Sequence, residues 1–574
     1  MDVVLLMIVI FLAFFIVYKL YGTFIAKKIY KLRDENITPS KEFEDGIDYV
    51  PTKKEIIFGH HFTSIAGTGP IVGPAIAIIW GWVPALIWIV VGTLVMGAVH
   101  DFGSLVLSMR NQGKSISEIT GKYISRRART AFFGIVFIEL LIVIAIFGLV
   151  MAVVFHMYPQ SVFPVWFEIP LAIWMGYMVY KKKGNLFLYS IFAIVIMYIT
   201  IGIGTMWAIN MPAIGGIPAT GVWTIILLIY AYIASILPVT TLLQPRDYIN
   251  SHELFVAMGL LVLGVIASAF KGGFHIVAPA VNASPAGAPP VIPFLFITIA
   301  CGAISGFHSL VSSGTSSKQV MKESDTQLVG YGSMVMEGVL ASMVVIAVSA
   351  GIGLAYKTSG GTVVSGVQAW TAHYSSWAAA AGLGSKVAAF VIGSANMIHS
   401  LGIPQNFAIV IMGVFVVSFA GTTLDTATRI QRYIVSELFG KAPVFRNRYF
   451  ATAIAVVTAG LLAFATGASG KGALKLWPLF GATNQTLAAL ALLLITVWLK
   501  QKGGMRYLIA GLPCIFMAIM TTWALIINQS NFISAHNPLL IIINIIILAL
   551  NLWIIVEGLM AFAKGKKKVE VATE

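Results

Sequence analysis

The chain has 574 residues, of which 58% are hydrophobic and only 10% are charged, and it carries a formal net charge of +15. Soluble domains contain about 25% charged residues, so this composition excludes a soluble globular protein and indicates a polytopic membrane protein. The basic residues are dispersed among loops, which favours a topology signal facing anionic lipid over nucleic acid as a partner. Cys301 and Cys514 both lie in apolar segments and imply no disulfide framework and no cysteine-based metal site.

Fifteen apolar runs approach the ~20 residues that a helix needs to cross a bilayer. We therefore expect a single all-α transmembrane domain over residues 1–574, with peripheral helices at 3–20 and 507–562. In chain order the runs fall at 3–20, 60–80, 83–109, 131–156, 166–180, 187–209, 221–244, 254–271, 292–315, 330–354, 404–428, 449–466, 476–499, 507–528 and 539–562.

Two of these runs contain residues that interrupt a helix. The segment 58–74 holds Gly67, Gly69, Pro70, Gly73 and Pro74, and the segment 299–309 has a similar glycine-rich pattern. A broken helix is tolerated in a bilayer only against protein or a water-lined cavity. Interrupted spans in two halves of a chain are typical of the substrate site of a secondary transporter. The alternative is close helix packing, since small residues also line tight crossings.

Candidate substrate contacts gather at these two interruptions. The ends of half-helices present unpaired backbone groups, so the N-terminal end attracts an anion and the C-terminal end a cation. Asn484 and Gln485 supply neutral hydrogen bonding, either to substrate or between helices. The predicted substrate-binding residues are Gly67, Thr68, Gly69, Gly302, Ser305, Gly306, His308, Asn484 and Gln485.

A second set of residues could couple transport to an ion. Histidines and carboxylates within a membrane can pass protons, and hydroxyls beside a carboxylate suit Na⁺ or a proton. Two structural alternatives stay open: the histidines anchor loops, and Asp425 pairs with Arg429 one helical turn away. The sequence contains no His-rich spacing of metal ligands, so no metal site is predicted. The candidates are His60, His61, His308, Glu337, Thr422, Thr423, Asp425 and Thr426.

Basic residues predict the orientation. They concentrate in segments 22–56, 110–130 and 429–448 and in the tail at 564–568, whereas the loops 210–220 and 272–291 have none. The positive-inside rule then places the N-terminus outside and the C-terminus in the cytoplasm. Counting the apolar stretch 386–401 as a span would put the basic 429–448 segment outside, so we expect a re-entrant or external helix there. The Pro/Gly/Ala-rich 272–291 segment is the expected join between two helical repeats.

The interrupted segments and several others resemble the carbon starvation protein A family. The resemblance lies in 58–74, 98–102, 243–248, 294–318, 331–338, 424–433 and 476–485, which together span most of the chain. It implies a leucine-transporter-like fold of the amino acid–polyamine–organocation superfamily, with two inverted five-helix repeats at about 58–271 and 292–499. The spans 60–80 and 292–315 would be its broken first and sixth helices, and 404–428 the eighth helix, which supplies Ser/Thr ligands in sodium-coupled relatives.

The resemblance also implies a function. Family members are prokaryotic inner-membrane proteins linked to carbon starvation, described as peptide transporters or proton-coupled pyruvate transporters. We therefore expect a secondary active importer of pyruvate or short peptides in the cytoplasmic membrane. It should be driven by H⁺ or Na⁺, with no cofactor, no nucleic-acid partner and no enzymatic activity. The alternatives are a membrane starvation sensor, for which the sequence shows no signalling domain, and a His-dependent membrane metalloprotein.

Cysteines placed at positions 357 and 441 test this topology. If residues 386–401 do not cross, only the 404–428 span separates the two positions, and impermeant thiol reagents should label them from opposite sides of the membrane. Labelling from the same side would mean that 386–401 spans the bilayer, and the assignment of two inverted repeats would fail.

Overall fold

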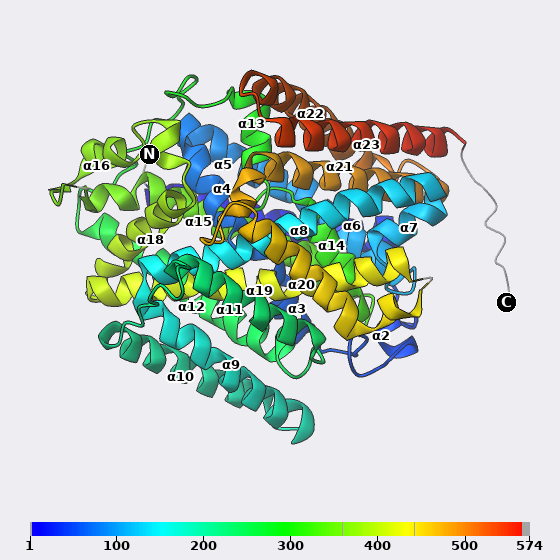
Figure 1. The fold of residues 1–574 in the computed structure, drawn as a ribbon, viewed down its shortest axis with the longest axis horizontal. Helices are drawn as coiled ribbons and strands as arrows, with labels where there is room; N and C mark the ends of the chain where they lie inside the picture. The colour runs from blue at the N-terminus through cyan, green and yellow to red at the C-terminus, as the bar shows by residue number, and fades with distance from the viewer. Residues whose placement is uncertain (1–2, 359, 441, 565–574) are drawn as a thin grey trace.

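The computed structural model describes residues 3–358, 360–440 and 442–564, so position 441 and the tail beyond 564 lie outside the described residues. Within these ranges the protein is a bundle of helices with one short antiparallel hairpin, β1 (Tyr356–Lys357) and β2 (Val363–Val364) (Figure 1). The helices are α1 (Val3–Val17), α2 (Pro39–Glu42), α3 (Lys54–Ala66), α4 (Gly69–Ala77), α5 (Trp82–Val91), α6 (Ala98–Met109), α7 (Ile116–Tyr123), α8 (Arg126–Met157), α9 (Val162–Gly176), α10 (Leu186–Met206), α11 (Ala219–Ile236), α12 (Leu243–Phe270), α13 (Val291–Thr298), α14 (Gly306–Gly314), α15 (Ser333–Ser349), α16 (Gly366–His373), α17 (Trp377–Ala380), α18 (Leu383–His399), α19 (Gln405–Phe439), α20 (Arg448–Phe464), α21 (Trp477–Gln501), α22 (Leu508–Ser534) and α23 (Pro538–Ala563).

Twelve helical stretches among the described residues are long and apolar enough to cross a membrane, and the bent pair α3–α4 makes a thirteenth. The all-α polytopic architecture expected from the sequence is therefore confirmed. Helices α13, α14 and α20 are shorter, with 8, 9 and 17 residues, and α18 is not among the candidate spans. The full number of crossings and the repeat boundaries stay predictions.

The first predicted interruption is present. Helix α3 ends at Ala66, and α4 begins at Gly69 after a bend of 41°. Gly67 has a φ of +36°, which a residue with a side chain rarely adopts, so the helix cannot continue through it. A Cβ on Gly73 would lie 2.7 Å from the backbone oxygen of Thr298, so glycine also lets α4 approach the second interrupted helix closely.

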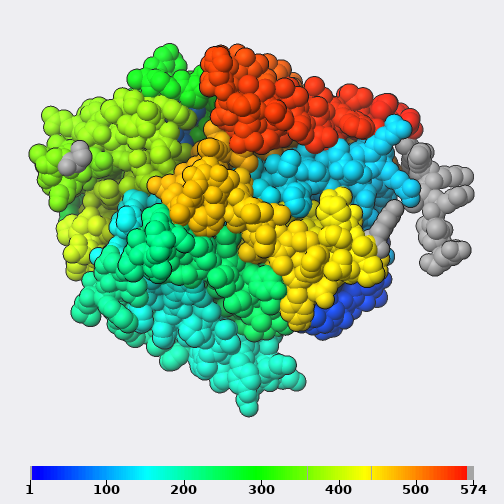
Figure 2. All heavy atoms as spheres, in the orientation of Figure 1, coloured from blue at the N-terminus to red at the C-terminus, as the bar shows by residue number. Residues whose placement is uncertain are grey.

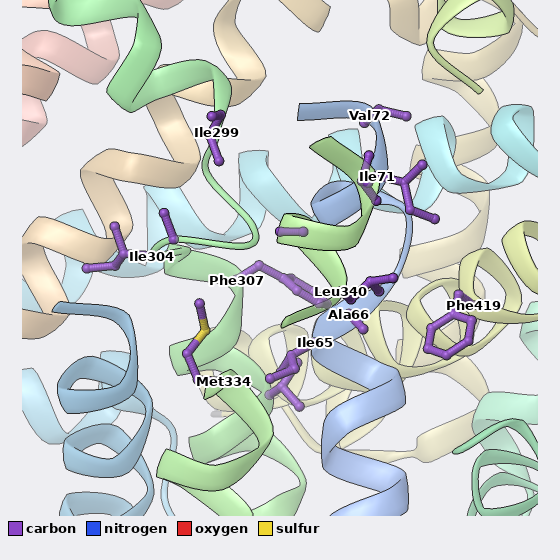
Figure 3. Packing of buried hydrophobic residues seen from close by; sticks show 14 of the residues in the cluster. Ile65, Ala66, Ile71, Val72, Ile299, Ile304, Phe307, Met334, Leu340 and Phe419 are labelled. Atoms are coloured by element: carbon purple, nitrogen blue, oxygen red, sulfur yellow. The ribbon is translucent and has the colours of Figure 1, made fainter. Parts of the chain in front are cut away.

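The second interruption is an unwound segment. Helix α13 ends at Thr298 and α14 begins at Gly306, with Gly302 at a φ of +88° between them. Figure 3 shows the unwound chain running between Ile299 and Ile304, with the turn of the first interruption on the facing side of the same region. A Cβ on Gly306 would collide with the backbone oxygen of Asn484, so α14 starts in direct contact with α21.

The remaining helices surround these interruptions. The long helix α19 contacts α3, α8, α12 and α18, and α21 contacts α6, α14 and α22. Helices α22 and α23 lie along one edge of the face seen in Figure 2, and α9 and α10 lie along the opposite edge. Helices α2 and α7, which belong to the basic segments, lie at one end of the molecule, and α16 and α18 lie at the other (Figure 1).

Helix α19 is longer than the sequence predicts. The 404–428 span was expected to end where the basic segment begins, but the helix continues to Phe439. Two arginines in this extension bond to Asp48, whose carboxylate pairs with Arg429 at 2.7 Å and with Arg432 at 2.9 Å. Burial by itself would raise the pKa of Asp48, but the two guanidinium groups outweigh it and hold that pKa well below its ordinary value.

The Asp48 contact predicts a stability change. Asp48→Asn leaves two buried guanidinium groups without their carboxylate, so we expect the free energy of unfolding to fall by about 2–4 kcal/mol at pH 7. Because the folded-state pKa is lowered, the stabilisation is complete above the unfolded-state pKa of about 3.9 and is lost only below it. Thermal melting in detergent should thus show the same deficit at pH 7 and pH 5. The exposed neighbour change Glu44→Gln should shift stability by less than about 0.5 kcal/mol. Equal melting of the two variants would contradict the prediction.

Candidate functional site

A cavity of about 720 Å³ ends at the two helix interruptions. Gly69 and Gly73 from α4 and Ala300 and Cys301 from the unwound segment form part of its wall, and a Cβ on Gly69 would collide with the Cys301 thiol. The other lining residues are mostly apolar or aromatic: Val72, Ile76, Gly287, Ala288, Pro289, Pro290, Phe294, Ile297, Thr298, Trp377, Ala381, Lys386, Trp477, Pro478, Phe480, Gly481, Ile527, Asn528, Asn531 and Phe532. This is the size and character of a small-molecule pocket.

The N-terminal ends of two half-helices lie at this cavity or just behind its wall. Helix α4 begins at Gly69, preceded by Thr68, and α14 begins at Gly306, preceded by Ser305. Thr68, Ser305 and Gly306 are buried, so Gly69 is the predicted glycine that reaches the cavity wall. The aligned N–H groups at such ends carry a partial positive charge, which favours a carboxylate nearby.

The two predicted amides both hold the second interruption in place. Asn484 Oδ1 accepts a hydrogen bond from the Phe307 backbone N–H at 2.8 Å and one from the Ser305 hydroxyl at 3.2 Å. Gln485 Nε2 donates to the backbone oxygen of Phe296 at 2.8 Å. In this structure they therefore connect helices, which is the structural alternative that the sequence left open for them.

His308 lies at the centre of a buried chain of titratable groups behind the second interruption. Its Nδ1 is 2.9 Å from Asp101 Oδ2, and its Nε2 is 3.3 Å from Glu337 Oε2. Glu337 Oε1 accepts the Gly302 backbone N–H at 2.9 Å, and His100 Nδ1 lies 2.7 Å from Asp101 Oδ1. The chain therefore connects the unwound backbone to α6 and α15.

Cys301 brings this chain to the cavity. Its thiol, His308 and Glu337 offer ligand atoms within 4.8 Å of one another, and among the described residues they form the one group with a spacing suited to a metal ion. His308 and Glu337 also contact Asp101 and the Gly302 N–H. The group can therefore act as a proton path from the cavity wall without a metal.

A second buried cluster contains Asp425, for which the sequence left pairing with Arg429 open as a structural alternative. Its carboxylate bonds to the Arg246 guanidinium and accepts the Tyr230 hydroxyl at 2.8 Å, and it makes no ion pair with Arg429. Arg429 instead bonds to Asp48 and to backbone oxygens at the end of α11. Burial does not distinguish the two arginines, since Arg429 is 1% and Arg246 4% exposed, but the Arg429 guanidinium already bonds to Asp48 and to the Ala234 and Leu237 oxygens.

The same cluster continues to the first interrupted helix. Arg246 also contacts Asp247 at 3.2 Å, and Asp247 Oδ2 lies 2.6 Å from His60 Nδ1 on α3. Thr422 Oγ1 faces this cluster and accepts hydrogen bonds from Arg246 and Asn250 at 3.1 Å. Thr422 and Asp425 therefore serve an arginine-centred network.

The other two predicted threonines face the C-terminal end of α3. Thr423 Oγ1 donates to the backbone oxygen of Ser64 at 3.2 Å, and Thr426 Oγ1 lies 3.0 Å from Ser64 Oγ. These oxygens lie beside the end of a half-helix that favours a cation. His61 belongs to neither group, since its Nδ1 bonds to Ser316 at 2.7 Å.

Sequence reasoning did not select Arg246, Asp247, Asp101 and Tyr230, although all four lie in these networks. The signal was present for the first two, since adjacent opposite charges follow the apolar 221–244 run. Tyr230 gave no signal, because a tyrosine in an apolar helix is unremarkable until its hydroxyl is seen to reach a carboxylate.

Comparison with known proteins gives consistent matches over the chain. A family described as "Carbon starvation protein CstA" matches residues 2–524. "Peptide transporter CstA" of Campylobacter jejuni is 34% identical over 564 residues, and the match covers 88% of this chain and 77% of that protein. The protein of the same name from Bacillus subtilis is also 34% identical, and the match covers 89% of this chain and 88% of that protein. "Pyruvate/proton symporter BtsT" of Escherichia coli is 32% identical, covering 89% and 80%. Among solved structures, MhsT in complex with L-phenylalanine has 12% identity and a TM-score of 0.46, covering 89% of this chain and 98% of MhsT.

The Arg246–Asp425 pair predicts that replacing the carboxylate lowers stability strongly and that replacing the arginine as well restores part of it. Asp425→Asn leaves a buried guanidinium with one carboxylate fewer, so we expect the free energy of unfolding to fall by about 3–5 kcal/mol. The double variant Asp425→Asn with Arg246→Gln should recover part of that loss, because it removes the unpaired charge. Thr428→Val on the same helix loses only a bond to its own backbone and should cost about 1 kcal/mol. Melting curves in detergent measure all three, and additive losses in the double variant would show that the pair is not coupled.

Proposed function

The chain belongs to the carbon starvation protein CstA family, and we propose that it is a secondary transporter that imports a small carboxylate-bearing nutrient, pyruvate or a short peptide, into the cell. Its relatives are named as a peptide transporter and as a pyruvate/proton symporter. Pyruvate and peptides share a carboxylate, so one recognition chemistry serves both.

The observation that carries this proposal is the position of the cavity. It ends where α4 begins and where the unwound segment leads into α14, so the partial positive charges of two half-helices lie at or close behind one wall. Its volume of about 720 Å³ accommodates pyruvate or a short peptide. The mostly apolar remainder of the lining lowers the local dielectric and so strengthens that electrostatic attraction.

We assign the coupling ion as a proton carried by the Asp101–His308–Glu337 chain. Glu337 accepts the Gly302 N–H of the unwound segment and lies 3.3 Å from His308. Protonation of Glu337 weakens that charge-assisted bond, so the shape of the second interruption depends on proton occupancy. The oxygens of Ser64, Thr423 and Thr426 at the end of α3 favour a sodium site instead, and a separately imposed sodium gradient tests that alternative.

In the orientation that we propose, the cavity lies toward the external side of the cytoplasmic membrane. Helices α2 and α7 of the basic segments lie at one end of the molecule and α18 lies at the other (Figure 1), and Lys386 of α18 lines the cavity. The positive-inside rule assigns the basic end to the cytoplasm, with the N-terminus outside and the C-terminus inside.

Uptake by proteoliposomes tests substrate and coupling together. Wild-type protein should exchange labelled pyruvate or a labelled dipeptide and concentrate it under an inward proton gradient but not under a sodium gradient. Glu337→Gln should keep the exchange and lose at least about tenfold of the gradient-driven accumulation, because the neutral amide cannot titrate. Glu55→Gln, at an exposed position in the first turn of α3, should behave as wild type.

The outcomes separate the parts of the proposal. Full accumulation by Glu337→Gln would remove Glu337 from the coupling path, and accumulation under sodium alone would favour the Ser64–Thr423–Thr426 group. Absence of exchange of either substrate by the wild-type protein would overturn the proposed substrate class.

A further inference from the structure

One cationic side chain faces the cavity without a carboxylate partner. Lys386, near the start of α18, lines the cavity and is 6% exposed, and it is the only charged residue among the described residues of the lining. Its ammonium lies 5.1 Å from the centre of the Trp477 ring, which lines the same cavity. No described carboxylate lies within 4 Å of it.

Such a position is costly for a lysine unless an anion completes it. Lysine is almost never this deeply buried without a partner, and a single aromatic ring replaces only part of its hydration. Burial lowers the pKa of Lys386 to about 8, so the side chain is still mostly protonated at neutral pH. The buried guanidinium groups of Arg246 and Arg429 have carboxylates beside them, whereas Lys318, which is as buried as Lys386, lies 3.6 Å from the centre of the Tyr433 ring.

A second side chain in the lining has an unsatisfied donor. Asn528 of α22 is also 6% exposed and lines the cavity, and its buried Nδ2 has no hydrogen-bond partner among the described residues. A carboxylate has two oxygens that accept hydrogen bonds and a charge that attracts an ammonium, so its chemistry suits a cavity wall that carries both donors.

We propose that Lys386 and Asn528 form a capture site in which the carboxylate of the incoming substrate binds before it reaches the interrupted helices. This inference rests on the proposed function and adds to it the residues that first recognise the substrate. A single cation between low-dielectric walls concentrates anions in the cavity. The N-terminal end of α4, which reaches the cavity wall at Gly69, then receives the carboxylate.

A purely structural role for Lys386 makes a different prediction. If the ammonium only anchors α18 to Trp477, replacing it alters stability but affects charged and uncharged substrates equally. A capture site instead alters the half-saturation concentration, and it does so only for substrates that carry a carboxylate.

Counterflow kinetics in proteoliposomes distinguish the two roles. Lys386→Met keeps the aliphatic stem and removes the charge, and it should raise the KM for a labelled dipeptide or pyruvate at least tenfold with a maximal rate within threefold of wild type. Lys386→Arg should stay within threefold of the wild-type KM. Lys475→Met, at an exposed lysine two residues before Trp477, controls for the loss of a positive charge nearby and should leave the KM unchanged.

Competition adds a reading that does not depend on the lysine variants. Wild-type protein should prefer a dipeptide over its C-terminal amide at least tenfold, and Asn528→Leu should reduce this preference severalfold while the protein still folds and exchanges substrate. An unchanged preference in Asn528→Leu, or an unchanged KM in Lys386→Met, overturns the capture site while transport by the wild type leaves the proposed function intact. If the wild type exchanges neither substrate, the proposed function and the capture site fail together.

Discussion

The backbone N–H and C=O groups at the two helix interruptions need hydrogen-bond partners other than water. The rest of the structure is arranged around that requirement. Inside a bilayer each unpaired N–H or C=O costs several kcal/mol, so other side chains have to replace the lost helical bonds. At the second interruption they come from three different segments. Glu337 accepts the Gly302 N–H, Thr93 donates to the Gly302 oxygen at 2.8 Å, and Asn484 accepts the Phe307 N–H.

This requirement gives single residues two tasks. Glu337 caps unwound backbone and contacts His308, so a change in its protonation acts directly on the conformation of the interruption. Thr423 does the comparable work at the first interruption, where it donates to the Ser64 oxygen at the end of α3. An ion that binds at either place therefore competes with a bond that holds the backbone, which is a physical basis for coupling ion binding to conformational change.

The buried charges divide into two networks with different compositions. The network around His308 contains histidines and carboxylates, which exchange protons readily, and it lies behind the cavity wall formed by Cys301. The network around Arg246 contains a permanent cation held by Asp247 and Asp425, and it connects α12 and α19 to His60 on α3. The first suits proton transfer, whereas the second fixes the position of the first interrupted helix relative to α12 and α19.

The sequence by itself determined the family, the membrane-embedded helical class and the location of both interruptions, because hydropathy and glycine or proline chemistry act over a few neighbouring residues. It also identified His308 and Glu337 as unusual, since a charge in an apolar run is visible locally. Only the tertiary structure decided the partners. Asp425 has Arg429 one turn away, yet it bonds to Arg246, which is 179 positions distant in the chain. Lys386 is unremarkable in the sequence and becomes a candidate only because the fold places it in the lining of a cavity, with no carboxylate of the described residues within 4 Å. Burial and pairing depend on which distant helices pack together, and no local pattern contains that information.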